Sequence, residues 1–118
     1  MREPLKDKGR LGHILASIER IERFTAGMTF DDLRKDEVTY YAVVKCIEII
    51  GEASYMLLTN EFREIHSQTA WRDIIAMRHV LVHGYYQVSA KQVWKVIQED
   101  LPPLKEQVAT YNKDFVEK

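Results

Sequence analysis

The sequence contains a single cysteine, Cys46, so no disulfide can form within one chain. Cys46 lies in an apolar run, and we expect it to pack in the core. No apolar run approaches the roughly 18 residues that a membrane-spanning helix needs. The charged opening MREPLKDKGR is not followed by the apolar segment of a signal peptide. These absences predict a cytoplasmic protein that has no membrane partner.

The sequence also has no marked excess of positive or negative charge. The chain has 17 lysines and arginines against 18 aspartates and glutamates, a formal net charge of −1. These charges form no long runs, which argues against an extended basic surface for duplex nucleic acid but allows a small cationic site. Internal repeats, low-complexity segments and β-strand alternation are absent as well. The 118 residues fit one domain, residues 1–118.

What the sequence does contain is helical periodicity, with apolar residues three and four positions apart. A first amphipathic helix is predicted over residues 11–24. Thr29 and Asp32 resemble a capping box, which predicts that a second helix begins near Phe30 and either continues or restarts at Asp36. The stretch 38–58 is apolar on nearly all sides, so we expect this helix in the middle of a bundle.

Capping and apolar spacing also predict a long last helix. Ser89 and Gln92 form a capping box, so this helix should begin at Ala90. Its apolar stripe is Trp94, Ile97, Leu101, Leu104, Val108, Tyr111 and Phe115. Pro102 and Pro103 interrupt the stripe and predict a kink or a short fifth helix. The whole pattern predicts an all-α fold, an antiparallel up-and-down bundle of four to five helices.

A helix between these, beginning at Trp71 and capped by Thr69 or Ser67, carries an arginine in its apolar stripe. Arg78 falls on the line of the aliphatic side chains of this helix. A guanidinium cannot be neutralised, so it needs a carboxylate, a phosphate or a wet cleft. Glu52, on the narrow polar side of the preceding helix, is the candidate partner. An ion pair with a purely structural role is one explanation of Arg78.

A catalytic role is the other explanation, because His79 and His83 lie one helical turn apart beside Arg78. Cleaving RNA without a metal needs a proton acceptor, a proton donor and a cation on the phosphate. Histidine and arginine suit these tasks. Residues five apart on a helix point about 140° away from each other. Either the helix end near Gly84 turns His83 towards Arg78, or a second copy of the chain supplies the partner.

The stretch RHVLVHGYY, with four residues between Arg78 and His83 and one before Tyr85, resembles the signature of the HEPN superfamily, particularly its HepT branch. The stretch AVVKCIEIIGEAS is similar to the second helix of HepT proteins. Its glycine, Gly51, is costly inside a helix and predicts close approach of another backbone. The resemblance covers residues 11–104. It implies a HEPN-like homodimer in which the arginine–histidine motifs of two chains face each other across a cleft.

The resemblance further implies a metal-independent endoribonuclease toxin, paired with a minimal nucleotidyltransferase (MNT) antitoxin. Arg78 would be the phosphate-binding cation and His83 the general acid or base. Tyr85 would be the residue that the antitoxin adenylylates, and the added anionic nucleotide would occupy the cleft that RNA needs. Supporting or phosphate-binding roles are expected for His79, Arg72 and Glu52.

Two other interpretations stay open. His79 and His83, with Glu48 and Glu52, have the spacing of a bundle-core metal site, but no Glu-x-x-His pattern accompanies them. We therefore expect neither a metal nor another cofactor. HEPN domains also serve as non-catalytic, nucleotide-binding or substrate-presenting companions of nucleotidyltransferases. Both this module and a nuclease need arginine and histidine near a phosphate.

Overall fold

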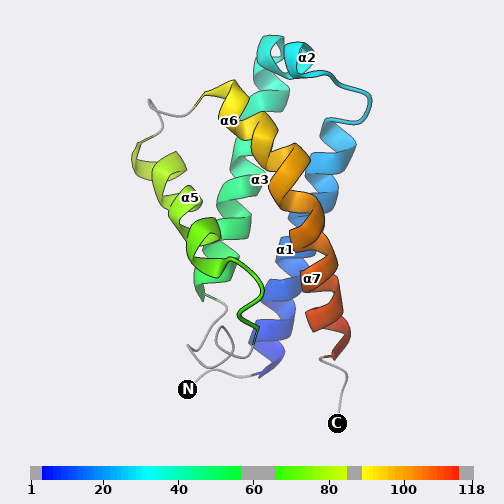
Figure 1. Ribbon diagram of the computed structural model, residues 1–118, viewed down its shortest axis with the longest axis vertical. Helices are drawn as coiled ribbons and strands as arrows, with labels where there is room; N and C mark the ends of the chain where they lie inside the picture. The colour runs from blue at the N-terminus through cyan, green and yellow to red at the C-terminus, as the bar shows by residue number, and fades with distance from the viewer. Residues whose placement is uncertain (1–3, 57–65, 85–88, 115–118) are drawn as a thin grey trace.

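The computed structural model describes residues 4–56, 66–84 and 89–114. Within these residues every regular element is helical, as predicted. α1 (Pro4–Phe24) leads away from the end of the molecule where both chain termini lie, and α3 (Glu37–Met56) returns to that end (Figure 1). α5 (Trp71–His83) leads away again, and a last helical run returns. The predicted antiparallel up-and-down bundle is confirmed.

The connection between α1 and α3 follows the predicted capping signals. Gly27 has a φ of +76°, a left-handed conformation that glycine adopts without strain after a helix end. Thr29 Oγ1 accepts a hydrogen bond from the Asp32 N–H at 3.1 Å, and Asp32 Oδ2 accepts one from the Thr29 N–H at 2.9 Å. α2 (Phe30–Lys35) therefore begins at the predicted box. The carboxylate of Asp36 then accepts a backbone hydrogen bond from the first turn of α3, at 3.0 Å.

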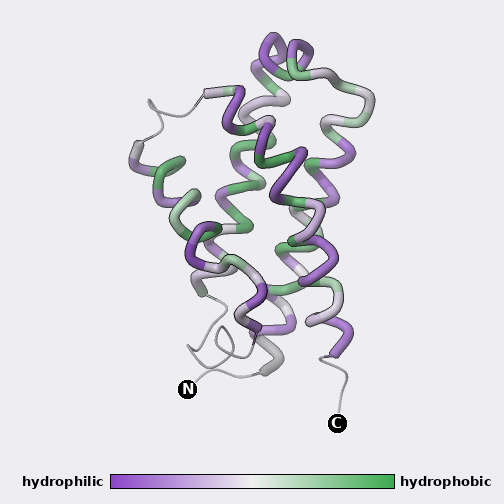
Figure 2. The backbone as a smooth tube through the Cα atoms, in the orientation of Figure 1, coloured by the Kyte–Doolittle hydropathy of each residue, from purple (hydrophilic) through white to green (hydrophobic). Residues whose placement is uncertain are grey.

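The core lies around α1 and α3, with α7 (Leu101–Asp114) packed against α1 and α5 packed against α3. Hydrophobic and hydrophilic stretches alternate along each helix (Figure 2). Cys46 is buried as predicted, and burial raises the pKa of its thiol. Large side chains with almost no exposed surface are Leu11, Ile14, Ile18, Ile21, Leu33, Val43, Ile50, Val93 and Val108.

α3 packs against both α1 and α5, which agrees with its predicted central place, but one of its faces is open to solvent. On this face Val38, Tyr41 and Tyr55 are 81%, 63% and 55% exposed. The sequence had predicted only a narrow polar side on this helix, so the exposure of these three residues was not expected. Among the described helices, none combines the length and the apolar character needed to cross a membrane.

α6 (Ala90–Lys95) begins at the second predicted capping box. Ser89 Oγ accepts a hydrogen bond from the Gln92 N–H at 3.3 Å, and Gln92 Oε1 accepts one from the Ser89 N–H at 2.8 Å. α6 continues without a break into η2 (Val96–Asp100) and α7 (Leu101–Asp114). The two prolines therefore lie in the first turn of α7, inside one continuous helical run.

η2 is a π-helical turn, and it changes which residues face the core. The Leu101 N–H donates to the carbonyl of Val96, five residues back instead of four. The extra residue in this turn shifts the apolar face, so Val93 and Val96 are buried. Trp94 and Ile97, which the regular spacing had placed in the core, are only partly buried. From Leu101 to Tyr111 the predicted stripe is correct, because Leu101, Leu104, Val108 and Tyr111 are all buried.

Candidate functional site

α5 comes very close to α3 at the glycine for which the sequence predicted such an approach. A Cβ added to Gly51 would overlap the Cβ of Arg78 and lie 3.3 Å from its Cα. Any side chain at position 51 would therefore push the two helices apart. The backbone contact places Arg78 directly beside α3.

The start of α5 is not held by the predicted cap. Its N-cap is Ala70 and makes no side-chain hydrogen bond, so the prediction that Thr69 or Ser67 caps this helix is wrong. The buried Thr69 hydroxyl instead lies 2.6 Å from the Tyr111 hydroxyl and 2.8 Å from Gln107 Oε1, both on α7. These hydrogen bonds tie the segment before α5 to α7.

His66 joins the same group of side chains. Its ring centroid lies 4.1 Å from that of Tyr111, and its carbonyl accepts a hydrogen bond from Trp71 Nε1 at 3.1 Å. Burial lowers the pKa of His66, and the charge of Asp114 opposes this in part. We call His66, Thr69, Gln107 and Tyr111 the clasp, because they join the start of α5 to α7.

Arg78 pairs with Glu52, as predicted. Its Nη2 lies 2.9 Å from Glu52 Oε1, and the two side chains are 33% and 48% exposed. The pair is therefore at the surface, where ion pairs contribute about 0–1 kcal/mol, and not inside the apolar core. A guanidinium has five N–H donors, so this ion pair leaves Arg78 with donors for a further anion.

His79 and His83 come together as their spacing predicted. Their ring centroids are 4.6 Å apart, and both side chains are exposed at the end of α5. The helix stays regular up to His83, because the Gly84 N–H donates to the Val80 carbonyl at 2.7 Å. The helix end therefore does not turn His83 towards Arg78 within one chain.

Arg78 faces a hollow of about 320 Å³ that α1, α3 and α5 line together. We call it the Arg78 trough. α3 forms its floor, because α3 lies between the other two helices. The lining residues are Arg10, His13, Lys45, Glu48, Ile49, Glu52, Ala53, Met56, Arg78 and Val82. Neither histidine of α5 is among them.

Two lining residues of the trough, Arg10 and His13, were not among the predicted site residues. They come from α1, more than sixty positions before Arg78 in the chain. Their three-residue spacing at the border of the apolar stripe of α1 places them on one side of that helix. This spacing was the available sequence signal, and it does not say which helix they face.

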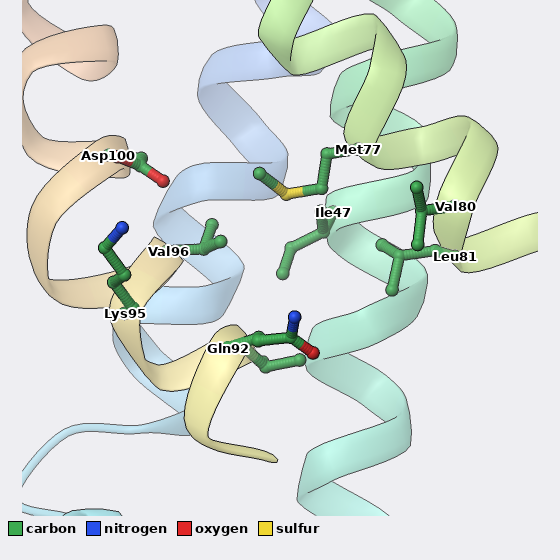
Figure 3. A pocket seen from close by; sticks show the side chains of 9 residues that line it. Ile47, Met77, Val80, Leu81, Gln92, Lys95, Val96 and Asp100 are labelled. Atoms are coloured by element: carbon green, nitrogen blue, oxygen red, sulfur yellow. The ribbon is translucent and has the colours of Figure 1, made fainter. Parts of the chain in front are cut away.

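Arg72 lies apart from Arg78. It is exposed near the start of α5 and lines a separate hollow with Tyr55 and Trp71. A further hollow, of about 290 Å³, lies between α5 and the α6–η2 run (Figure 3). Its walls are mostly apolar, with Met77 and Leu81 on the α5 side. The structure thus brings Arg78 together with Glu52 but not with Arg72.

Tyr85, the predicted modification site, lies outside the described residues, as does Phe115. Between the residues that the structure does describe, no group of three or more histidine, cysteine, aspartate or glutamate side chains is placed to hold a metal ion. The candidate site is therefore a surface arginine with a carboxylate partner, next to two exposed imidazoles on the same helix.

Comparison with known proteins points to one family. A family model described as "Ribonuclease HepT-like" matches residues 14–111. The chain is 41% identical over 98 residues to "Probable ribonuclease HepT" of Thermococcus cleftensis, covering 83% of this chain and 88% of the relative. It is equally identical, over 98 residues, to a protein named "Putative RNase" of Caldanaerobacter subterraneus, covering 83% and 87%. No solved structure gives a significant match.

Proposed function

Because this chain belongs to the HepT-like ribonuclease family of the HEPN superfamily, we propose that it is a metal-independent endoribonuclease whose active site forms between two copies of the chain. The observation that carries this proposal is the separation of the two motif side chains. Arg78 lines the trough, whereas His83 lies outside it at the exposed end of α5. One chain offers the cation and the imidazole in different directions, and a second copy completes the pair.

In the proposed reaction the 2′-oxygen of a ribose attacks the adjacent phosphorus. His83 of one protomer takes the 2′-hydroxyl proton, Arg78 of its partner holds the phosphate, and water donates a proton to the departing 5′-oxygen. Arg78 stabilises the negative charge that builds up on the phosphorane oxygens. The products are a 2′,3′-cyclic phosphate and a 5′-hydroxyl, so atoms and charge balance without a metal.

Exposed side chains near Arg78 and His83 support the proposal that a second copy of the chain covers this part of α5. Val80 and Val82, between Arg78 and His83, are 43% and 37% exposed. Exposed aliphatic side chains next to a charged motif are typical of an interface. Glu52 orients the guanidinium through their 2.9 Å ion pair. His79 contacts the ring of His83 and supports its orientation.

The proposal extends to regulation. The protein acts as a cytoplasmic toxin, and an MNT antitoxin switches it off by adenylylating Tyr85, which puts an anion two residues from His83. Expression of the protein should slow growth unless the nucleotidyltransferase is co-expressed. Incubation with that enzyme and ATP should add the mass of one adenylyl group at Tyr85. An unmodified Tyr85 would contradict the regulatory part alone.

RNA cleavage in excess chelator tests the catalytic part. The wild-type protein should convert single-stranded RNA into fragments with 2′,3′-cyclic phosphate ends. Arg78→Ala and His83→Ala should each slow cleavage by about 100-fold or more. Lys91→Ala, an exposed change on α6, is the matched control and should cleave normally. Intact RNA together with measurable nucleotide binding would instead support the non-catalytic module.

A further inference from the structure

The Arg78 trough carries more cations than the proposed chemistry uses. Arg10 lines it from α1 and Lys45 lines it from the floor, along with Arg78 from α5, and the carboxylates of Glu48 and Glu52 also lie on the floor. Cations therefore lie on both walls and between them. The trough lining has three such cations and two carboxylates, a formal excess of one positive charge, in a chain whose formal net charge is −1.

Two of these cations are only loosely paired. Arg10 Nη1 lies 3.6 Å from Asp7 Oδ1, and Lys45 Nζ lies 3.8 Å from Glu48 Oε1, both beyond hydrogen-bonding distance. By comparison, the pair of Arg78 with Glu52 is 2.9 Å long. Arg10 Nη1 is buried and has no hydrogen-bond partner among the described residues. Because Nη1 is buried beside Asp7, Arg10 offers an anion in the trough only its remaining N–H donors, whereas the Lys45 ammonium is on an exposed side chain.

The trough is too long for a single phosphate. α3 rises about 1.5 Å per residue, so Lys45 and Glu52 are about 10 Å apart along its floor. One turn before Lys45 on the same face of α3, Tyr41 is 63% exposed. Cations along a groove combined with an exposed aromatic ring are the features that bind single-stranded nucleic acid.

We propose that the Arg78 trough binds the backbone of single-stranded RNA, with Arg10 and Lys45 contacting phosphates that flank the one at Arg78. Tyr41 stacks on a base next to these phosphates. This inference rests on the proposed function, because it takes the phosphate at Arg78 to be the scissile one. The extra contacts hold the strand in place and take no part in proton transfer.

Binding of a fluorescein-labelled 2′-O-methyl RNA decamer, followed by anisotropy, tests the trough separately from cleavage. The 2′-O-methyl groups remove the attacking hydroxyl. Lys45→Ala and Arg10→Ala should each lower the slope of log affinity against log salt by about 0.7. Tyr41→Ala should weaken binding about fivefold or more with little change in this slope.

Controls separate binding from folding. Lys45 and Lys91 are both exposed lysines, so Lys91→Ala removes the same charge outside the trough and should leave the salt slope unchanged. Circular dichroism melting should show that Lys45→Ala folds normally, because the Lys45 side chain is 70% exposed. This variant keeps the test valid if Arg10→Ala destabilises the protein.

The outcomes distinguish the two proposals. If Lys45→Ala binds the decamer like Lys91→Ala, the trough proposal is overturned, whatever the cleavage assay shows. A wild-type protein that binds the decamer with the expected variant effects but never cuts unmodified RNA supports the trough and overturns the nuclease. Loss of the dimer in Lys45→Ala, with unchanged affinity per chain, would make the trough an interface between copies and overturn the RNA assignment.

Discussion

Gly51 sets how closely α5 approaches α3, and through it the position of Arg78. Gly51→Ala gains about 1 kcal/mol of helix propensity. The new Cβ, however, meets atoms of Arg78 at and next to the backbone, which cannot rotate away, and such overpacking costs about 1–3 kcal/mol. We expect a lower free energy of unfolding in chemical denaturation, together with slower RNA cleavage.

Gly12→Ala is the matched control for this change. Apart from the local backbone of α1, nothing among the described residues lies within 4 Å of a Cβ placed at Gly12. This substitution should raise the free energy of unfolding by about 0.5–1 kcal/mol. If Gly51→Ala stabilises the protein as much as Gly12→Ala does, the predicted clash has no energetic effect.

His66 makes stability depend on pH. Burial lowers its pKa in the folded protein, so the unfolded chain binds more protons as the pH falls below about 6.5. Neutral His66 therefore makes its full contribution to the free energy of unfolding above that pH, and this contribution is lost as the pH falls through the folded-state pKa. We expect the free energy of unfolding to decrease between about pH 7 and pH 5.

Denaturation of His66→Phe over the same pH range checks this expectation. Phenylalanine retains a ring beside Tyr111 but does not titrate, so the decrease should become smaller. His13→Gln removes an exposed histidine outside the clasp and serves as the comparison. An unchanged pH dependence in His66→Phe would assign the decrease to other groups.

The π-helical turn η2 adds one residue to an otherwise regular apolar spacing in the last helical run. Deleting the exposed Gln98 would restore that spacing and keep the buried residues on both sides in line. The deletion would also tighten the turn before Pro102 and Pro103. In a regular α-helix a proline ring clashes with the carbonyl four residues back, at about 3 kcal/mol or more. We expect the deletion to destabilise the wild-type chain.

The same deletion should cost far less in a chain that carries Pro102→Ala and Pro103→Ala, because alanine fits a regular helix. Denaturation of the four proteins, with and without each change, measures the coupling between the turn and the prolines. A deletion that is equally costly in both backgrounds would show that η2 has a cause other than the prolines.

Local signals predicted where helices begin, because capping acts between residues three positions apart. The capping boxes at Thr29 and Ser89 are both formed. Thr69 was assigned the wrong role, because its partners Gln107 and Tyr111 lie 38 and 42 residues later in the chain. The π-helical turn was missed for a related reason, since regular spacing assumes an unbroken α-helix.

The packing of α1, α3 and α5 brings more residues to the trough than the sequence predicted. The pairing of Arg78 with Glu52 could be predicted, because a charge in an apolar stripe needs a partner. The presence of Arg10 and His13 in the same trough could not, because it depends on how α1 packs against α3. The assignment of His83 to a site shared by two chains stays a prediction.

Mixing two inactive variants tests that shared site. Arg78→Ala and His83→Ala should each be inactive alone, whereas mixed dimers retain one intact pair, with Arg78 from one chain and His83 from the other. Co-expression with different affinity tags and purification on both tags isolates the mixed dimer. We expect it to regain part of the wild-type cleavage rate. A purified mixed dimer without activity would place both residues in one chain's site.

α5 is anchored at its start by the clasp and at its middle by the contact with Gly51, whereas its last turn has hollows on two sides. A tilt of the helix about these anchors displaces its tip most and its middle least. Arg78 lies at the contact with Gly51, so a bending of the last turn moves the imidazole of His83 more than the guanidinium of Arg78. The two side chains of the proposed active site therefore differ in how firmly the fold holds them.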